Sequence, residues 1–186
     1  MPKQRVTREA VVEAAFQLAR REGMEAVLVK NVARVLNCSV QPIYSYCGSM
    51  EGLCRAVEAR TADFVREYAA ARRDPADPFR STGMAYLELA REEPRLYRIF
   101  FLRRQEEVGS MEELYRREAS PEAAAGLAQT TGLSEEKAKN LHLHMILYSM
   151  GLGFLLASGA DLGEEAAERL EEAYEIFLRQ MREEQE

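Results

Sequence analysis

VKNVARVLNCSVQPIYSY, residues 29–46, reads as two short helices joined by a tight turn. Apolar residues recur over residues 29–36 with the three- and four-residue spacing of one helical face, which predicts a two-turn helix. Asn37 follows, and asparagine is one of the few residues besides glycine that adopts the left-handed conformation after a helix. Ser39 is a suitable N-cap for a second helix, and Pro42 falls in its first turn, where its missing N–H costs no bond. The stretch therefore predicts a helix-turn-helix, which places its second helix in the major groove of DNA.

The packing inside this motif also follows from the spacing. We expect Val40 and Ile43 of the second helix to point back at Val32 and Leu36 of the first. Ala33 is small, so it allows two helices that cross steeply over a short turn to bring their backbones close. These contacts would fix the second helix in place.

The motif and its flanks resemble the TetR family of bacterial transcriptional repressors, from Thr7 to about Tyr68. The likeness covers about a third of the chain. It rests on the motif, on the Thr-capped, Ala-rich run TREAVVEAAFQLARREG before it, and on IYSYCGSMEGL, an aromatic-containing run followed by a serine-capped fourth helix. The resemblance implies an all-α fold with an N-terminal three-helix DNA-binding domain and a C-terminal helical domain for ligand binding and dimerisation.

The chain departs from that family at four positions of the motif. Leu28, Asn37, Cys47 and Met50 stand where the family usually has a capping Thr, a Gly, a Phe and a phosphate-contacting Lys. Loss of one phosphate contact predicts weaker binding to every DNA sequence and a salt slope lower by about one. A second interpretation therefore stays open, a binding or interaction module of the same fold with weak or no DNA binding.

The resemblance also implies which residues face DNA. Lys30 and Ser39 would contact phosphates, and five residues would face base edges or backbone: Val40, Gln41, Pro42, Ser45 and Tyr46. Gln41 is the best base reader, because its amide can pair with adenine in two places. Tyr44 aligns with a phosphate-contacting tyrosine, but packing beneath the motif is an equal alternative. Lys3 and Arg5 precede the first helix and form either a DNA-contacting arm or a solvated terminus.

The charge is divided unevenly along the chain. The net charge is −6, yet residues 1–60 hold nine Lys or Arg against six Glu, which gives +3 and leaves −9 for the rest. This asymmetry favours an N-terminal nucleic-acid face on an acidic body. The N-terminus lacks a hydrophobic signal region and no stretch of about 20 residues is apolar throughout, so we expect a cytoplasmic protein without a membrane span.

Helix signals along the chain predict about nine helices in two domains, residues 1–70 and 71–186, with the reading motif at about 28–47. The charged, proline-containing segment ARRDPADP, residues 71–78, marks the boundary. The first helix should run from Thr7 to Gly23 and bury Val12, Ala15, Phe16 and Ala19. Later helices should begin at Ser49, Asp77, Pro94, Ser134 and an Asp161–Glu164 capping box. Residues 111–131 form either one broken helix or two pieces, the second of them starting near Pro121.

The last two predicted helices favour a homodimer. Residues 145–157 are apolar on nearly every face, which predicts that this helix contacts both its own core and a partner. In the resembled family the last two helices of each subunit pair into a four-helix bundle, and the candidates here are Leu152, Leu155, Leu156, Leu170, Tyr174, Phe177, Leu178 and Met181. A twofold dimer would present two reading helices about 34–36 Å apart to a palindromic operator.

The resemblance further implies an effector cavity in the second domain, and the function of a repressor released by a small, largely apolar molecule. The candidate lining residues are Met84, Leu87, Tyr97, Phe100, Tyr115, His142, Met145, Tyr148 and Met150, although core packing predicts the same residue types. His142 and His144 are two apart and point to roughly opposite sides of a helix, so we expect no shared metal. Surface exposure is the main expectation for them, and a polar group within the cavity is the alternative for one of the two.

Other functional classes find less support. No Glu precedes either histidine at the spacing of a di-iron bundle, and no nucleophile, base and orienting group cluster together, so we expect no enzyme and no cofactor. Three cysteines without metal-ligand spacing predict no disulfide framework. A thiol switch at Cys38 or Cys47, beside the reading helix, remains a further mechanism of release.

Overall fold

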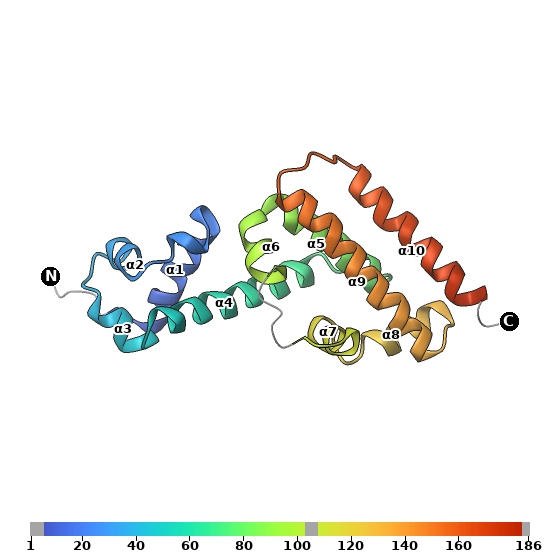
Figure 1. Ribbon diagram of the computed structural model, residues 1–186, viewed down its shortest axis with the longest axis horizontal. Helices are drawn as coiled ribbons and strands as arrows, with labels where there is room; N and C mark the ends of the chain where they lie inside the picture. The colour runs from blue at the N-terminus through green and yellow to red at the C-terminus, as the bar shows by residue number, and fades with distance from the viewer. Residues whose placement is uncertain (1–5, 103–107, 184–186) are drawn as a thin grey trace. The chain divides into compact units, whose positions relative to one another are not determined.

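The computed structural model describes residues 6–102 and 108–183. Within these ranges the chain forms ten α-helices and a short 3-10 helix, with no strand (Figure 1). The all-α prediction is therefore confirmed, with one helix more than the approximate number expected. The chain divides into two compact units, residues 1–68 with 92–103, and residues 69–91 with 104–186.

The first unit contains the predicted reading motif. It is built from α1, Arg8–Glu22; η1, Met24–Ala26; α2, Val29–Val35; α3, Gln41–Cys47; most of α4, Met50–Ala71; and α6, Pro94–Phe101. α1 packs against η1, α2, α3 and α6, so it is the brace around which the motif is assembled. Its inner face differs by one residue from the prediction, because Val11 is fully buried whereas Val12 is only half-buried.

α6 belongs to the first unit, although the sequence boundary after residue 70 placed it in the second. Its entry is tied to α1 by Arg20, whose Nε donates to both carboxylate oxygens of Glu93 at 2.9 Å. Ile99 of α6 also packs on the apolar core of the unit. These contacts join two segments that are far apart in sequence, and local composition carries no signal of them.

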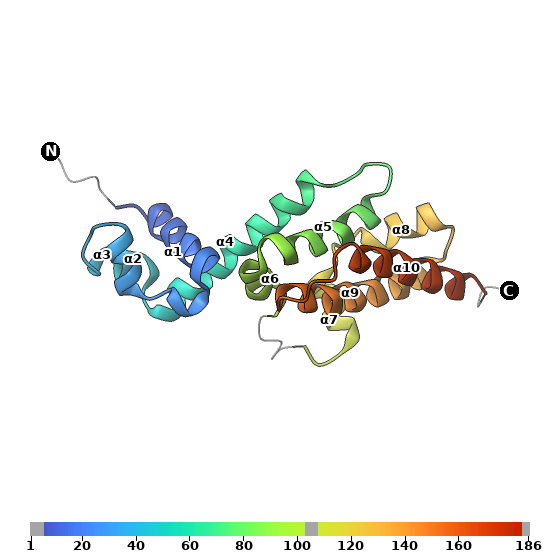
Figure 2. The same ribbon diagram turned by 90° about the horizontal axis from the view of Figure 1, so that it is seen from above.

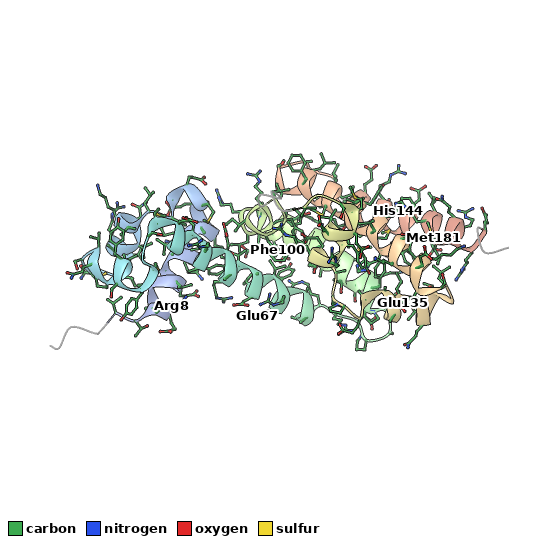
Figure 3. The ribbon with its side chains drawn as sticks, turned by 60° about the horizontal axis from the view of Figure 1, so that its bottom comes forward. Arg8, Glu67, Phe100, Glu135, His144 and Met181 are labelled. Carbon is green, nitrogen blue, oxygen red and sulfur yellow. The ribbon has the colours of Figure 1, made fainter. Side chains whose placement is uncertain are left out.

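The second unit is a stack of helices around α9. Its elements are α5, Pro78–Glu92; α7, Met111–Glu118; α8, Ala123–Thr131; α9, Glu135–Ala157; and α10, Glu165–Glu183. α8 and α10 both pack along α9 (Figures 1 and 2). Figure 3 locates Glu135 at the start of α9 and Met181 near the end of α10. The region 111–131 forms two helices, the second of the two arrangements considered.

Most predicted helix starts are confirmed. Thr7 accepts a hydrogen bond from the Ala10 N–H at 3.2 Å, Ser49 from Gly52 at 3.0 Å, and Ser134 from Lys137 at 3.4 Å. Asp77 accepts from the Arg80 N–H at 3.1 Å. Each side chain satisfies one of the N–H groups that a helix start leaves without an intrahelical partner. The Asp161–Glu164 prediction is wrong, because α10 begins at Glu165 and Asp161 lies too far ahead of it.

α9 bears on the expectation that the chain has no membrane span. By length and composition it is long and apolar enough to cross one, although the sequence showed no continuous apolar stretch of that length. Three of its apolar residues, Leu141, Met145 and Leu156, are buried in the unit. Leu147, Phe154 and Leu155 are instead 43%, 48% and 46% exposed. The helix thus serves the core with one face and leaves an apolar face uncovered.

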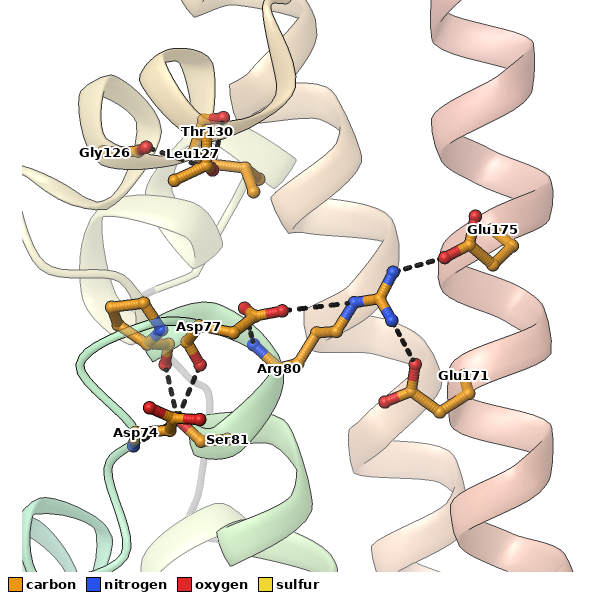
Figure 4. A network of polar contacts seen from close by, with 10 residues as sticks. Asp74, Asp77, Arg80, Ser81, Gly126, Leu127, Thr130, Glu171 and Glu175 are labelled. Atoms are coloured by element: carbon orange, nitrogen blue, oxygen red, sulfur yellow. Dashed lines mark hydrogen bonds and ion pairs between the residues drawn. The ribbon is translucent and has the colours of Figure 1, made fainter.

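A charged cluster joins α5 to α10 within the second unit (Figure 4). Arg80 donates from Nη1 to Glu171 at 2.9 Å and from Nη2 to Glu175, and its Nε lies 3.4 Å from Asp77. The guanidinium also lies over the ring of Tyr174, 4.3 Å from its centroid. Arginine suits this position because its planar fork can serve several carboxylates and stack on an aromatic face together.

Candidate nucleic-acid interface and effector site

The turn between α2 and α3 forms as its sequence predicts. Asn37 has a φ of 48°, the left-handed conformation that ends α2. The Cys38 N–H donates to the Ala33 carbonyl at 3.0 Å and closes the turn. Asparagine tolerates this conformation at little cost, so the usual glycine is not required here.

One side chain, Ile43, locks α3 against the rest of the unit. Ile43 is 1% exposed and packs in a core cluster with Val32 and Ala33. Two details of the predicted packing are wrong. Val40 is 41% exposed and does not turn back to the core, since it occupies the N-cap position with helical backbone angles. Ser39 therefore precedes the cap and does not bond the helix start, whereas Pro42 does lie in the first turn.

The outer face of α3 is open to solvent. Gln41, Tyr44 and Ser45 are spaced at i, i+3 and i+4 on this face, and all three are exposed. Tyr44 is 49% exposed, which excludes the alternative that it packs beneath the motif. The remaining predicted DNA-facing residues are exposed at Lys30, Ser39, Val40 and Tyr46 and half-buried at Pro42.

A second exposed cation lies on α2. Arg34 is one helical turn after Lys30, on the same side of the helix, and its Nη2 donates to the Asn31 side-chain oxygen at 2.9 Å. Sequence reasoning missed Arg34, although the four-residue spacing from Lys30 was a sufficient signal. Arg8, at the start of α1 (Figure 3), is a further exposed cation of this unit.

Tyr46 has a partner that the sequence did not reveal. Its hydroxyl donates to the backbone carbonyl of Val6 at 2.9 Å, 40 residues earlier in the chain. Val6 also packs on the apolar core of the unit. The predicted basic arm, Lys3 and Arg5, lies outside the described residues. The side chain of Tyr46 on α3 therefore holds the backbone at Val6, the first described residue.

The positions that depart from the resembled family have definite places. Met50 is half-buried and packs on the core cluster, and Leu28 is 50% exposed at the N-cap of α2, where no side chain caps the helix.

Gly52 is required by a close approach, because a Cβ built on it would lie 2.0 Å from the Cys47 carbonyl oxygen. Burial raises the pKa of the Cys47 thiol, which disfavours the reactive thiolate that a redox switch needs.

The second unit holds a polar pair among aromatic rings. His142 Nδ1 and the Tyr115 hydroxyl are hydrogen-bonded at 3.1 Å, and the Phe79 ring meets the imidazole edge-on at 5.1 Å. Burial lowers the pKa of His142 to about 4, so the imidazole is neutral at pH 7. Of the two positions considered for the histidines, surface exposure holds for His144, whose ring stacks on that of Phe177 with 4.8 Å between the centroids, whereas His142 is half-buried.

The predicted effector residues do not share one unit. Tyr97 and Phe100 lie on α6 in the first unit, where both rings contact Phe101. The others belong to the second unit, buried at Leu87, Tyr115 and Met145 and half-buried at Met84, His142, Tyr148 and Met150. In the part of the chain that the structure describes, no group of three or more His, Cys, Asp or Glu is placed to hold a metal ion.

The candidates for a dimer interface divide by burial. Five are part of the chain's own core: Leu156, Leu170, Tyr174, Leu178 and Met181. Leu155 is exposed, and Leu152 and Phe177 are half-buried. Exposed positions from the centre of α9 to its C-terminal end instead form one stripe, composed of His144, Leu147, Gly151, Phe154 and Leu155 and continued by the C-cap Ser158. Ile176 of α10 is a further exposed apolar residue.

Together these features define an all-helical protein with an exposed helix-turn-helix and a separate helical unit. Solved structures with this fold include a TetR-like transcriptional regulator from Rhodococcus sp. RHA1, at 18% identity and a TM-score of 0.64 over 92% of this chain and 95% of that one. The structure of BioQ is similar at 13% identity and a TM-score of 0.57, over 96% of this chain and 99% of that one. Another transcriptional regulator from Rhodococcus sp. Rha1 is similar at 17% identity and a TM-score of 0.56, over 95% of this chain and 96% of that one. No protein-family profile and no curated protein sequence matches the chain. The protein therefore has the fold of TetR-like regulators.

Proposed function

We propose that this protein is a dimeric, ligand-responsive, DNA-binding transcriptional regulator that represses from a palindromic operator. The observation that carries the proposal is the two-sided character of α3. Gln41, Tyr44 and Ser45 are exposed together, while Ile43 of the same helix is 1% exposed. A helix held rigidly on one side that offers hydrogen-bonding groups on the other is suited to the major groove. The TetR-like fold and the charge of +3 over residues 1–60 support the same function.

Selection of bound duplexes from a random pool, repeated at several salt concentrations, tests DNA recognition. We expect a palindrome with half-site centres about one helical turn apart. Gln41→Ala should relax specificity at one position of each half-site by about 1–3 kcal/mol, because it removes a base contact. Lys30→Ala should weaken all duplexes alike and lower the salt slope by about one per contact. Gln129→Ala, at an exposed glutamine of α8, is the matched control. Absence of a palindrome together with unchanged binding by Gln41→Ala would contradict the proposal.

Dimerisation is supported by the uncovered apolar stripe of α9. More than 40% of the surface of each of three neighbouring residues is exposed: Leu147, Phe154 and Leu155. Such exposure is unusual for large apolar side chains on one helical face. Gly151 lies between them and has open space where its Cβ would be, so a second helix could approach closely. A twofold axis beside α9 would cover this stripe with its own copy.

The effector part of the proposal is supported by Tyr115 and His142. A neutral imidazole hydrogen-bonded to a phenol beside the Phe79 ring suits a small, largely apolar molecule with one hydrogen-bonding group. Binding would favour a conformation of the dimer whose reading helices no longer fit the operator. A thermal-shift screen of apolar compounds, followed by operator release with each compound that binds, tests this step. Tyr115→Phe should weaken the response, and the control Gln129→Ala, at an exposed residue of α8, should not. Compounds that bind without releasing DNA would contradict this step.

A second candidate is an effector-binding or interaction module without a DNA target. The observations that favour it are Met50, half-buried on the core in place of a phosphate contact, and Leu28, which leaves the start of α2 uncapped. The same two experiments separate the candidates. If no duplex is enriched while compounds still raise the melting temperature, the module without DNA binding is the better description.

A further inference from the structure

We infer that Arg34 is a phosphate-contacting residue of the DNA interface and that Asn31 is the positioning residue that orients its guanidinium. The inference deepens the proposed function and rests on it, because it names a further anchor of α2 on the DNA backbone. The resemblance implied phosphate contacts at Lys30, Ser39 and Tyr44 and none at position 34.

The position of Arg34 on α2 is the first part of the argument. Val29, Val32 and Ala33 bury one face of this helix in the core of the unit. Lys30 and Arg34 are both exposed and, being four residues apart, are neighbours on the helix surface. In a helix-turn-helix the second helix enters the major groove while the first crosses the sugar-phosphate backbone. Exposed cations of α2 are therefore the side chains that this arrangement brings to phosphates.

A pair of hydrogen bonds that starts at η1 is the second part. Asn31 Nδ2 donates to the Ala26 carbonyl at 2.9 Å, and Asn31 Oδ1 accepts from Arg34 Nη2 at 2.9 Å. The two partners fix the orientation of the amide, because a carbonyl only accepts and a guanidinium only donates. Asn31 is half-buried, and Ala26 ends η1. The guanidinium of Arg34 is thereby tied to the backbone of a neighbouring element through one side chain.

The charge of Arg34 is the third part. Three other arginines of the first unit pair with carboxylates: Arg20, Arg60 and Arg66. In the described part of the chain, Arg34 is instead bonded to a neutral amide and to no carboxylate. A neutral partner orients the guanidinium without cancelling its charge and leaves most of its N–H donors open for phosphate oxygens. An oriented arginine also loses less side-chain entropy on binding than a free one, so the contact contributes more to affinity.

The salt dependence of binding to the selected operator tests Arg34. Arg34→Ala should weaken binding roughly 5–10-fold at about 0.1 M salt and lower the salt slope by about one, because one phosphate no longer releases its counterions. Arg34→Lys keeps the charge and should retain the slope. The control is Arg66→Ala on α4, which makes the same change in net charge at a side chain that is 69% exposed. A slope unchanged in Arg34→Ala, or lowered equally by Arg66→Ala, would overturn the inference.

A double-mutant cycle tests the positioning role of Asn31. Asn31→Ala should weaken operator binding severalfold when Arg34 is present and change it little in the Arg34→Ala background. Thermal unfolding and circular dichroism of each variant show that the fold is retained. A residue that only supports the fold weakens binding by the same factor in both backgrounds, and that result would remove the role assigned to Asn31.

Chemical modification of the unsubstituted protein gives a measurement that needs no variant. Phenylglyoxal reacts with accessible guanidinium groups, and the bound operator should protect Arg34 while Arg66 stays reactive. If the operator is bound and Arg34 reacts as fast as in the DNA-free protein, the inference fails and the proposed function stands. If no duplex is bound by any form of the protein, both fail.

Discussion

At the scale of single residues, the reading motif depends on one close backbone contact. Gly52 lies in the first turn of α4, where a Cβ would be 2.0 Å from the carbonyl oxygen of Cys47 at the end of α3. The obstacle is backbone, so it cannot move away as the tip of a side chain would. The residue type at position 52 therefore sets how closely α4 follows the reading helix.

We predict that Gly52→Ala destabilises the first unit and displaces α3. Overpacking of this kind costs about 1–3 kcal/mol, which exceeds the gain of up to about 1 kcal/mol in helix propensity. The control is Gly126→Ala in α8, where a Cβ meets nothing within 4 Å and the same propensity gain should appear alone. Urea denaturation of both variants gives the measurement. A stability of Gly52→Ala equal to or above that of the unsubstituted protein would contradict the close contact.

His142 gives a prediction for pH. Its pKa is lowered to about 4 in the folded chain by burial, whereas the unfolded chain keeps a value near 6.5. The unfolded state therefore binds the proton more readily, and stability from this group is complete above about pH 6.5 and is lost as pH falls toward 4. We expect a loss on the order of 2 kcal/mol over this window.

Comparison of variants isolates the contribution of His142 from that of the carboxylates. Unfolding of His142→Gln should show a shallower decline of stability between pH 6.5 and 4, since glutamine does not titrate. Gln129→Ala should follow the unsubstituted protein, because residue 129 is exposed on α8 and does not titrate. If the stability of the two variants falls equally between pH 6.5 and 4, the environment formed by Tyr115 and Phe79 does not disfavour the charged imidazole of His142.

At the scale of helices, sequence predicted local features better than distant ones. The caps at Thr7, Ser49, Asp77 and Ser134 and the turn at Asn37 depend on residues within a few positions, and all were predicted. Ser39 failed as a cap because Val40, which lacks a capping group, takes the N-cap position.

Contacts between distant segments were beyond sequence reasoning. The Tyr46 hydroxyl reaches Val6, and α6 joins the first unit through Arg20 and Glu93, at separations that periodicity and spacing do not encode. Within the helix-turn-helix, burial of Ile43 was predicted from the residues of the motif, whereas the outward positions of Gln41 and Ser45, which are exposed, were implied by the family resemblance. The half-burial of Met50 was not predicted, since sequence gives no direction for a side chain at the boundary of two helices.

We predict that Arg80 makes a larger contribution to stability than other arginines of the second unit. Arg80→Met keeps the aliphatic stem but leaves Asp77, Glu171 and Glu175 without their shared cation. The side chain is 34% exposed, so solvent screening limits the loss to roughly 1–2 kcal/mol. Arg169→Met is the control, because Arg169 pairs with Glu165 and Glu172 of its own helix and its side chain is 54% exposed, so the melting temperature should change little. Added salt should narrow the difference between the two variants, and equal effects at low salt would contradict the prediction.

At the scale of the whole molecule, the unresolved question from sequence was which face of α9 is outward. The run MILYSMGLGFLLA is apolar on nearly every face, so no pattern separates core from surface. The structure separates them: Met145 and Leu156 are buried, whereas Leu147, Phe154 and Leu155 are exposed. Five of the eight residues proposed for a dimer are buried in the chain's own core, and four of these five belong to α10.

We predict that the exposed stripe of α9 is what holds two copies together. Phe154→Glu combined with Leu155→Glu should shift the protein from dimer to monomer in sedimentation experiments, with the fold retained by circular dichroism. Burial of one large apolar side chain contributes about 1.5–3 kcal/mol. Because twofold symmetry places each substitution in both subunits, this burial is lost twice for each residue, and the dissociation constant of the dimer should rise at least about 100-fold. Met111→Glu, at a 59% exposed residue of α7, should leave the dimer intact. Because a palindrome requires two reading helices, the α9 variant should also lose operator binding at concentrations where the Met111 variant retains it; a dimer of undiminished affinity would place the interface elsewhere.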